Sequence, residues 1–381
     1  MMIGEDWKLS LNGTGHKVMK MAEVRDWRPW SDLPEDLIGL IAKHLGMIDY
    51  ILFGCVCKSW KSYVSAHRQD FMASQSPHIL LLPAYIRSSC CFLYNISDKK
   101  NYKALLPSLI GKLCLGIAGG YLVFQNKHDN MKSPLWLLNP ITRHELHFPS
   151  SPYPLCRVIL ASSTVPRGEY VIVGFSPGHP YLQFFRSSDS HWTVHKFQIA
   201  NPWGFIVDGA FFKGKIYFLT SHGKIGVFDP SSAPYFKLLE VKRIRKRIGC
   251  KTQLVASNEH LLVIRKADNR YYEVFEVYEL NFLTKSWIRQ RSLGDQVLFI
   301  GDCEGTLPFC TEAKWEGCED AQNCSIFSVG YSGERFTAHS LDTRCSKEIS
   351  IEPGGRMPTF LMDRAFWYFP QLACKVDSLS Q

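Results

Sequence analysis

A serine between two glycines is the first candidate for chemistry in this sequence. Residues 174–178 read Gly-Phe-Ser-Pro-Gly, the G-x-S-x-G pattern of a nucleophile elbow, in which the serine attacks a carbonyl carbon. Such an elbow needs a helix directly after the serine and a backbone N–H on the next residue to hold the oxyanion. Here the next residue is Pro177, which has no N–H, and a strand pattern follows. The sequence therefore predicts a turn between two strands and no catalytic serine.

Cysteines and histidines are the other residues that could hold a metal or act as nucleophiles. Four of the thirteen cysteines fall in one segment, with gaps of 7, 8 and 6 residues: Cys303, Cys310, Cys318 and Cys324. Ligand pairs in zinc sites usually stand two to four residues apart. His191 and His195 have i, i+4 spacing, but in a strand context that spacing brings no further ligand to them. We therefore predict no metal, no cofactor and no catalytic residue.

The cysteine count also bears on the compartment. The number is odd, the spacing is irregular, and a chain of 381 residues can build a large core without disulfide bonds. We interpret the cysteines as reduced, mostly buried thiols of an intracellular protein.

One short segment carries most of the net positive charge. The formal net charge is +9, and the segment from Lys242 to Arg247 together with Lys251 supplies six positive charges. The candidate patch consists of Lys242, Arg243, Arg245, Lys246 and Arg247. Three interpretations stay open: a solvated loop or charged edge strand, a nuclear-import signal, and a surface for an acidic partner. The first is favoured, and because the charge is local we expect no nucleic-acid partner.

The composition and the N-terminal residues are typical of an ordinary globular protein without a signal peptide. Apolar residues make up 46% and charged residues 21%, as in ordinary globular proteins. No apolar run reaches the roughly 18 residues of a membrane span. The first twenty residues have early acids and no signal-peptide core, and Met21 would also serve as a start. We expect a flexible leader over 1–26, a cytoplasmic and/or nuclear location, and no membrane partner.

Helical patterns begin at Pro34. A proline followed by Glu35 and Asp36 suits a first helical turn, because the missing N–H costs nothing there and the acids complement the helix dipole. One apolar stripe follows, made of Leu37, Ile38, Ile41 and Leu45. Gly46 is predicted to end this helix.

Two more short helices are predicted before Arg68. Asp49 can cap the second, and the third runs from Cys55 to Val64. Its apolar face consists of Val56, Trp60, Tyr63 and Val64. Three helices in about forty residues cannot bury this many large apolar side chains internally. An apolar surface of this kind indicates a partner.

Strand patterns replace the helices after Ser76 and recur at a regular spacing. Apolar strands begin at His78, Gly119, Gly168, Gly214, Glu259 and Cys324, with spacings of 41, 49, 46, 45 and 65 residues. Repeats of 40 to 50 residues with several short strands each indicate a β-propeller. The longest spacing leaves an insertion or a seventh blade open, and the apolar segment 355–373 is expected to supply a closing strand to the first blade.

The fold expected from these patterns is a small all-α domain of three helices followed by an all-β propeller of six or seven blades. The boundaries are a leader over 1–26, the helical domain over 27–68, a linker over 69–77, the propeller over 78–372 and a tail over 373–381.

Two stretches resemble a known family. The segment "LPEDLIGLIAKHL", followed by "IDYILFGCVCKSWKSYV", resembles an F-box in the order and spacing of its anchors. The body resembles the KIB-type, kelch-like propeller that follows the F-box in a large plant group. The matching positions are Trp287, Ser292 to Asp295, Leu298, Phe299, Gly301, Gly317 and Cys318. The acidic spacer Glu-Asp-Ala-Gln after Cys318 departs from the family pattern.

The resemblance implies a function. An F-box docks a Skp1-type adaptor and, through it, a cullin, so the chain would be the substrate-recognition subunit of an SCF-type E3 ubiquitin ligase, with no catalytic residues of its own. The implied adaptor contacts are Leu33, Pro34, Leu37, Ile41, Leu45, Val56, Cys57 and Trp60. The propeller would bind an unknown protein substrate. The alternatives are an interaction scaffold that promotes no turnover and a propeller enzyme, for which the sequence shows no converging set of side chains.

Overall fold

The structure is a computed structural model of the chain. It describes residues 30–83, 90–126, 133–162, 170–196, 204–229, 235–242, 244, 248–249, 251–257, 259–267, 273–302, 306–312, 324–330, 333–351 and 362–370. The chain divides into two compact units, residues 1–67 and 68–381. The predicted leader and tail lie outside the described residues.

Three α-helices form the first part of the chain, as predicted. A 3-10 turn over Trp30–Asp32 precedes α1 (Glu35–Ala42), α2 (Met47–Phe53) and α3 (Lys58–Ser74). Pro34 stands at the N-cap of α1, with both acids in the first turn.

Four of the predicted helix boundaries were wrong, and one of them is the start of the third helix, which is Lys58 and not Cys55. The first helix ends at Ala42, before Gly46, and Gly46 instead stands at the N-cap of α2, while Asp49 lies inside its first turn. The third helix continues to Ser74 and covers most of the segment 69–77 that was predicted as a linker. No proline or glycine interrupts the sequence between Lys58 and Ser74, so nothing local ends this helix before Pro77.

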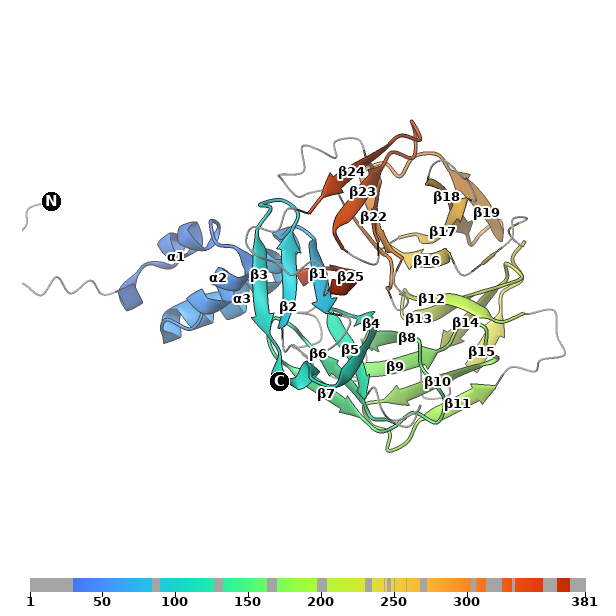
Figure 1. The fold of residues 1–381 in the computed structure, drawn as a ribbon, viewed down its shortest axis with the longest axis horizontal. Helices are drawn as coiled ribbons and strands as arrows, with labels where there is room; N and C mark the ends of the chain where they lie inside the picture. The colour runs from blue at the N-terminus through green and yellow to red at the C-terminus, as the bar shows by residue number, and fades with distance from the viewer. Residues whose placement is uncertain are drawn as a thin grey trace, which may run out of the picture. The chain divides into compact units, whose positions relative to one another are not determined.

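The second unit is a propeller of six sheets arranged in a ring (Figure 1). Blade 1 contains β25 (Met362–Tyr368), β1 (His78–Pro83), β2 (Cys90–Asn95) and β3 (Asn101–Leu105), and blade 2 contains β4 (Lys112–Ala118), β5 (Tyr121–Asn126), β6 (Leu135–Leu138) and β7 (Glu145–Phe148). Blade 3 contains β8 (Arg157–Ser162), β9 (Tyr170–Phe175), β10 (Tyr181–Arg186) and β11 (Thr193–Lys196), and blade 4 contains β12 (Ile206–Phe212), β13 (Lys215–Thr220), β14 (Ile225–Asp229) and β15 (Tyr235–Leu238).

The last two blades complete the ring. Blade 5 contains β16 (Thr252–Ala256), β17 (Leu261–Ala267), β18 (Val274–Asn281) and β19 (Ser286–Gln290). Blade 6 contains β21 (Phe309–Glu312), β20 (Gln296–Gly301), β22 (Ile326–Val329), β23 (Arg335–His339) and β24 (Ser346–Ser350). The number of blades is therefore six.

The repeating strands found in the sequence are the second strands of five sheets and the third strand of blade 6. They correspond to β1, β5, β9, β13, β17 and β22, and the first strand of most sheets comes earlier in the chain. Gly119 and Gly120 form the turn between β4 and β5, so the strand that was predicted to begin at Gly119 begins at Tyr121. Inner strands such as β12 contain glycine and a buried acid, which hides them from a search for apolar runs.

The 65-residue spacing between Glu259 and Cys324 contains an extra strand, β21. In blade 6, β21 pairs antiparallel with β20, and β20 pairs in parallel with β22. The remaining pairs of this sheet, β22 with β23 and β23 with β24, are antiparallel. In the described part of the chain, the insertion therefore widens one blade to five strands and forms no seventh sheet.

The chain end closes the ring, as predicted. β25 pairs antiparallel with β1, so that residues from both ends of the propeller share blade 1. Trp367 is buried against Phe299 of blade 6, with ring centroids 4.9 Å apart, and its Nε1 donates a hydrogen bond to the carbonyl of Ile300. This contact joins the first and last blades and closes the ring.

A buried ion pair joins the inner strands of three neighbouring blades. Arg157 on β8 donates to the carboxylate of Asp208 on β12, and both side chains are buried. The same carboxylate accepts from the backbone N–H groups of Gly209 and of Leu254 on β16. Burial raises the pKa of Asp208, whereas the Arg157 charge and the two N–H groups act in the opposite direction.

His78 on β1 makes folding stability depend on pH. Its side chain is fully buried, Nδ1 lies 2.9 Å from the carbonyl of Ser76, and burial lowers the pKa of His78 to about 4. The unfolded chain takes up this proton below about pH 6.5, whereas the folded chain does not until about pH 4. Stability is therefore expected to fall by about 2 kcal/mol between pH 7 and pH 5 from this group.

The measurement is urea unfolding at both pH values, compared with His78→Gln, which keeps a polar side chain but does not titrate. We expect the variant to lose less stability between the two pH values. An equal loss in both proteins would show that His78 does not cause the effect.

Candidate functional site

The first helix divides its apolar residues between two faces. Ile38 and Ala42 are buried, whereas Leu37, Leu40 and Ile41 are 45%, 55% and 37% exposed. The predicted stripe is therefore not one surface, because Ile38 faces inward while Leu37 and Ile41 stay accessible. Leu40 was missed in the sequence, although its i+3 spacing from Leu37 could have indicated it.

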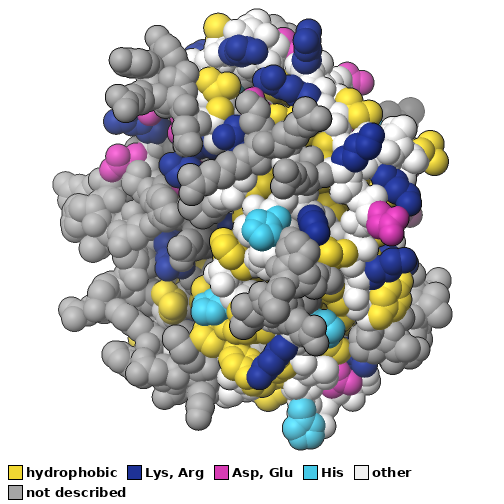
Figure 2. Space-filling model, turned by 90° about the vertical axis from the view of Figure 1, so that its right-hand side faces the viewer, with side chains coloured by type: hydrophobic (Ala, Val, Ile, Leu, Met, Phe, Trp, Pro, Cys, Tyr) yellow, Lys and Arg dark blue, Asp and Glu magenta, His cyan; other side chains and the backbone are white. Residues whose placement is uncertain are grey.

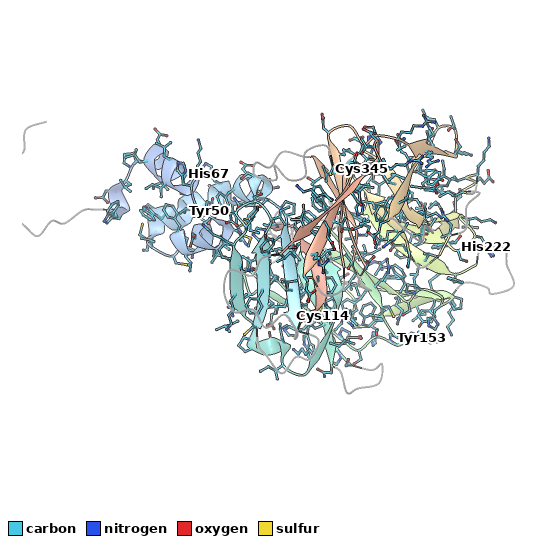
Figure 3. The ribbon with its side chains drawn as sticks, turned by 45° about the horizontal axis from the view of Figure 1, so that its top comes forward. Tyr50, His67, Cys114, Tyr153, His222 and Cys345 are labelled. Atoms are coloured by element: carbon cyan, nitrogen blue, oxygen red, sulfur yellow. The ribbon has the colours of Figure 1, made fainter. Side chains whose placement is uncertain are left out.

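The inward face packs around aromatic side chains from α2 and α3. Phe53 stacks on Trp60 with ring centroids 4.1 Å apart, and Tyr50, which Figure 3 labels among the helices, donates to the carbonyl of Val64. Met47 is almost completely buried as well. These contacts form a small interior that holds the three helices in place.

Trp60 and Ser59 also position the segment before α1. Nε1 of Trp60 donates to the carbonyl of Trp30 over 3.0 Å, and Oγ of Ser59 donates to the carbonyl of Ser31 over 2.8 Å. These two bonds tie the N-terminal turn to α3. Pro34, two residues after that turn, is exposed, and Leu33 is partly exposed.

The exposed apolar side chains are the candidate functional site of this unit. They are Trp30, Leu37, Leu40, Ile41, Leu52 and Val56, which are 53%, 45%, 55%, 37%, 59% and 58% exposed. We call this set the exposed apolar surface. Of the eight adaptor contacts implied by the sequence, Pro34, Leu37, Ile41 and Val56 are exposed, Leu33, Leu45 and Cys57 are partly exposed, and Trp60 is buried.

The polar chemistry near this surface is modest. Sγ of Cys57 lies 3.1 Å from Oγ of Ser59, and this hydrogen bond lowers the pKa of the Cys57 thiol. No metal-binding group of three His, Cys, Asp or Glu side chains occurs among the described residues of either unit. What the surface can do chemically is bury apolar area against another molecule.

The propeller contains one arrangement that looks like a nucleophile and its base. Oγ of Ser328 lies 2.9 Å from Nε2 of His339, and Oε2 of Glu273 lies 3.6 Å from the same nitrogen. In a catalytic triad the carboxylate holds the opposite nitrogen, Nδ1. Here Nδ1 is buried without a hydrogen-bond partner among the described residues, and burial lowers the pKa of His339 to about 4. The position of the carboxylate and the low pKa of His339 do not suit nucleophilic catalysis by Ser328.

The serine motif of the sequence lies in a turn, as predicted. Ser176 follows β9 directly, β10 begins at Tyr181, and Oγ of Ser176 donates to the carbonyl of Pro154. The side chain is buried and makes a structural hydrogen bond.

Most of the basic patch lies outside the described residues, namely Arg243, Arg245, Lys246 and Arg247. Lys242 is exposed, whereas Ile244 and Ile248 are buried in the core between blades 4 and 5. Figure 2 shows Lys and Arg side chains between hydrophobic ones over much of the face that carries these blades. Within the part of the chain that the structure describes, no helix is long and apolar enough to cross a membrane.

Comparison with protein families identifies both units. The family model described as KIB1-4 beta-propeller matches residues 93–333, more than half of the chain. The chain belongs to the KIB1-4 β-propeller family. The F-box domain model matches residues 30–71, which include α1, α2, most of α3 and the exposed apolar surface.

Curated relatives of this KIB1-4 propeller protein come from Arabidopsis thaliana. The F-box/kelch-repeat protein At3g18720 is 26% identical over 71% of this chain and 73% of its own length. The F-box/kelch-repeat protein At1g64840 is 26% identical over 78% of this chain and 84% of its own length. Among solved structures, TolB from Acinetobacter baumannii matches with 12% identity and a TM-score of 0.43, over 78% of this chain and 67% of that one.

These matches confirm the resemblance drawn from the sequence, that of a plant F-box protein with a propeller. An F-box in general implies a Skp1-type adaptor as a partner. The three helices of this KIB1-4 protein are therefore its F-box, and the exposed apolar surface is the F-box surface.

Proposed function

We propose that this protein is the substrate-recognition subunit of an SCF-type E3 ubiquitin ligase. Its F-box docks a Skp1-type adaptor and, through it, a cullin, and its propeller binds a protein that is to be ubiquitylated. The observation that carries the proposal is the set of six large apolar side chains exposed in the F-box, on α1, on α2 and in the segments before α1 and after α2.

The physical argument rests on the cost of this exposure. Fully burying a Leu or Ile side chain contributes about 1.5–3 kcal/mol, and the side chains of this surface, which are 37–59% exposed, would each contribute roughly half of that. Large apolar side chains that are exposed on a small helical unit indicate a surface that binds a partner protein. The hydrogen bond from Trp60 to the carbonyl of Trp30 holds the N-terminal turn in place. Leu33 and Pro34 therefore lose little conformational entropy when the adaptor binds.

The mechanism we propose is proximity. The receptor holds the target lysine near the charged E2 enzyme and contributes no catalytic group of its own, so the ligation becomes effectively intramolecular. No cofactor enters this mechanism. We also propose a cytoplasmic and/or nuclear location, where the ubiquitin system operates.

Affinity purification from plant cells tests this function. The full chain and a Leu33→Ala/Pro34→Ala variant are recovered with the proteasome and deneddylation blocked, and the co-purified proteins are quantified. We expect adaptor and cullin recovery to fall at least tenfold in the variant, while propeller-bound target proteins remain and are no longer ubiquitylated. Unaltered adaptor recovery would contradict the proposal, and adaptor binding without any ubiquitylated target would favour a scaffold that promotes no turnover.

A further inference from the structure

The interface between blades 5 and 6 contains cavities, whereas aromatic side chains fill two other blade interfaces. Aromatic pairs pack between blades 2 and 3 (Phe148 with Phe185) and between blades 3 and 4 (Phe184 with Phe228), with ring centroids 5.6 and 5.1 Å apart. Blades 5 and 6 share an apolar core near the axis. Farther out they leave two adjoining cavities of 430 and 960 Å³, which share Gln290 and Asp342 as lining residues. We call these two cavities together the blade 5–6 cleft.

Three arginines line the smaller cavity. Arg289 and Arg291 stand at i, i+2 at the end of β19 and therefore share one side of the chain, and Arg344 comes from the turn between β23 and β24. Arg289 lies 3.5 Å from a carboxylate oxygen of Glu276. Arg291 and Arg344 are exposed and have no carboxylate partner among the described residues. Figure 3 labels Cys345, which lines the same cavity beside Arg344.

The acids of the smaller cavity do not neutralise these arginines. Glu273 is paired with Lys266 and also lies near His339. Asp342 stands on the boundary with the larger cavity. The smaller cavity therefore offers unpaired guanidinium groups, the side chains best suited to hold a carboxylate.

The larger cavity has the opposite charge. Its lining includes Glu279, Asp295 and Asp342 and no lysine or arginine among the described residues. Glu279 is held by His260 and by Gln290, over 2.6 and 2.7 Å. Asp295 and Asp342 are exposed, and no hydrogen bond or ion pair engages their carboxylates in the described part of the chain. This end of the cleft is suited to an ammonium or guanidinium group.

We propose that the blade 5–6 cleft binds an extended peptide segment of mixed charge from a partner protein. Acidic side chains of the segment lie against Arg289, Arg291 and Arg344, and a basic side chain a few residues away lies near Asp295 and Asp342. The proposal rests on the proposed function, because it makes this segment the part of the target that the receptor recognises. Opposite charges at the two ends of one cleft set the register of the segment and exclude segments of a single charge.

The size of the cleft supports a peptide over a small anion. Two connected cavities of 430 and 960 Å³ are as large as typical ligand sites. An extended chain advances about 3.3–3.6 Å per residue, so a segment of six residues is about 20 Å long. A free anion such as phosphate would use only the arginine end.

Fluorescence anisotropy on the full-length protein tests this inference with three labelled hexapeptides. These are Glu-Glu-Gly-Gly-Lys-Lys, hexaglutamate and hexalysine, each measured at low salt, where ion pairs are least screened. We expect the mixed peptide to bind at least about fivefold more tightly than either single-charge peptide. Arg291→Met and Arg344→Met should each weaken it about three- to tenfold, and Asp295→Asn should weaken the mixed peptide but not hexaglutamate.

Arg335→Met is the matched control. Arg335 lies in the same blade but pairs with Glu348 outside the two cavities, so this variant should bind like the unchanged protein. Equal binding of all three peptides, or unchanged binding in Arg291→Met and Arg344→Met, would overturn the proposal. If hexaglutamate binds as well as the mixed peptide and inorganic phosphate displaces both, the cleft is a small-anion site and the proposal is wrong.

The F-box variant distinguishes a failure of the cleft proposal from a failure of the proposed ligase function. Leu33→Ala/Pro34→Ala should bind the mixed peptide normally, because it changes only the F-box. Arg291→Met should in turn recover the adaptor normally. If the protein binds the peptides without selectivity but recovers the adaptor through its F-box, only the cleft proposal is wrong. If it binds the mixed peptide selectively but does not recover the adaptor through its F-box, only the proposed ligase function is wrong.

Discussion

Replacing Leu37 and Ile41 together by aspartate is expected to abolish binding of a Skp1-type adaptor. Both side chains lie on α1 one turn apart, and both are exposed in this structure. If the exposed 45% of Leu37 and 37% of Ile41 are buried in the complex, each side chain contributes on the order of 1 kcal/mol through lost apolar surface alone. The two aspartates would in addition have to leave water without a partner. The affinity should therefore fall at least about 100-fold.

Isothermal titration of the purified full chain with a purified plant Skp1-type adaptor measures this effect. Because neither side chain belongs to the buried interior of the helices, the variant should unfold at nearly the same urea concentration as the unchanged protein. Leu283→Asp is the matched control: Leu283 is 94% exposed on the turn between β18 and β19, so the same kind of change there should leave adaptor binding intact.

An affinity within threefold of the unchanged protein would mean that α1 does not contact the adaptor. The adaptor contacts implied by the sequence would then have to lie elsewhere, for example around Leu52 and Val56 beyond α1. Ile38→Asp offers a useful contrast, because this side chain is buried and its replacement should unfold the F-box itself.

Replacing Asp208 by alanine is expected to cost the propeller about 3–5 kcal/mol of stability, the usual penalty for breaking a buried ion pair. The carboxylate is completely buried and accepts from Arg157, from Gly209 and from Leu254. Its removal leaves a buried guanidinium and two buried N–H groups without their acceptor. The penalty arises from these unpaired groups more than from the lost attraction.

Urea unfolding followed by tryptophan fluorescence measures the loss. The double variant Asp208→Ala/Arg157→Met should recover part of the stability, because no buried charge is then left unpaired. The control is Glu348→Ala, which breaks the exposed pair with Arg335 and should change stability by less than about 1 kcal/mol. A double variant no more stable than Asp208→Ala would show that the ion pair is not the source of the effect.

The amino-acid sequence by itself determined the class of each unit. Helical spacing from Pro34 onward and recurring apolar strands after Ser76 are local patterns, and each can be detected within about ten residues. The three helices, the β-propeller and the closing strand near Trp367 followed from such patterns, the F-box followed from the resemblance of its motif to a known family, and all four are confirmed. The turn at Ser176 was predicted for the same reason, because Pro177 lacks the N–H that a nucleophile elbow needs.

Only the tertiary structure decided how these elements pair and which faces stay exposed. The helical spacing did not separate Ile38, which is buried, from Leu37 and Ile41, because that depends on where α2 and α3 pack. The sequence left the extra strand β21 open between an insertion and a blade, since strand partners are chosen by contacts far apart in the chain. The blade 5–6 cleft is invisible in the sequence for the same physical reason: Arg291 and Arg344 stand more than fifty residues apart, and only the packing of two blades brings them to one cavity.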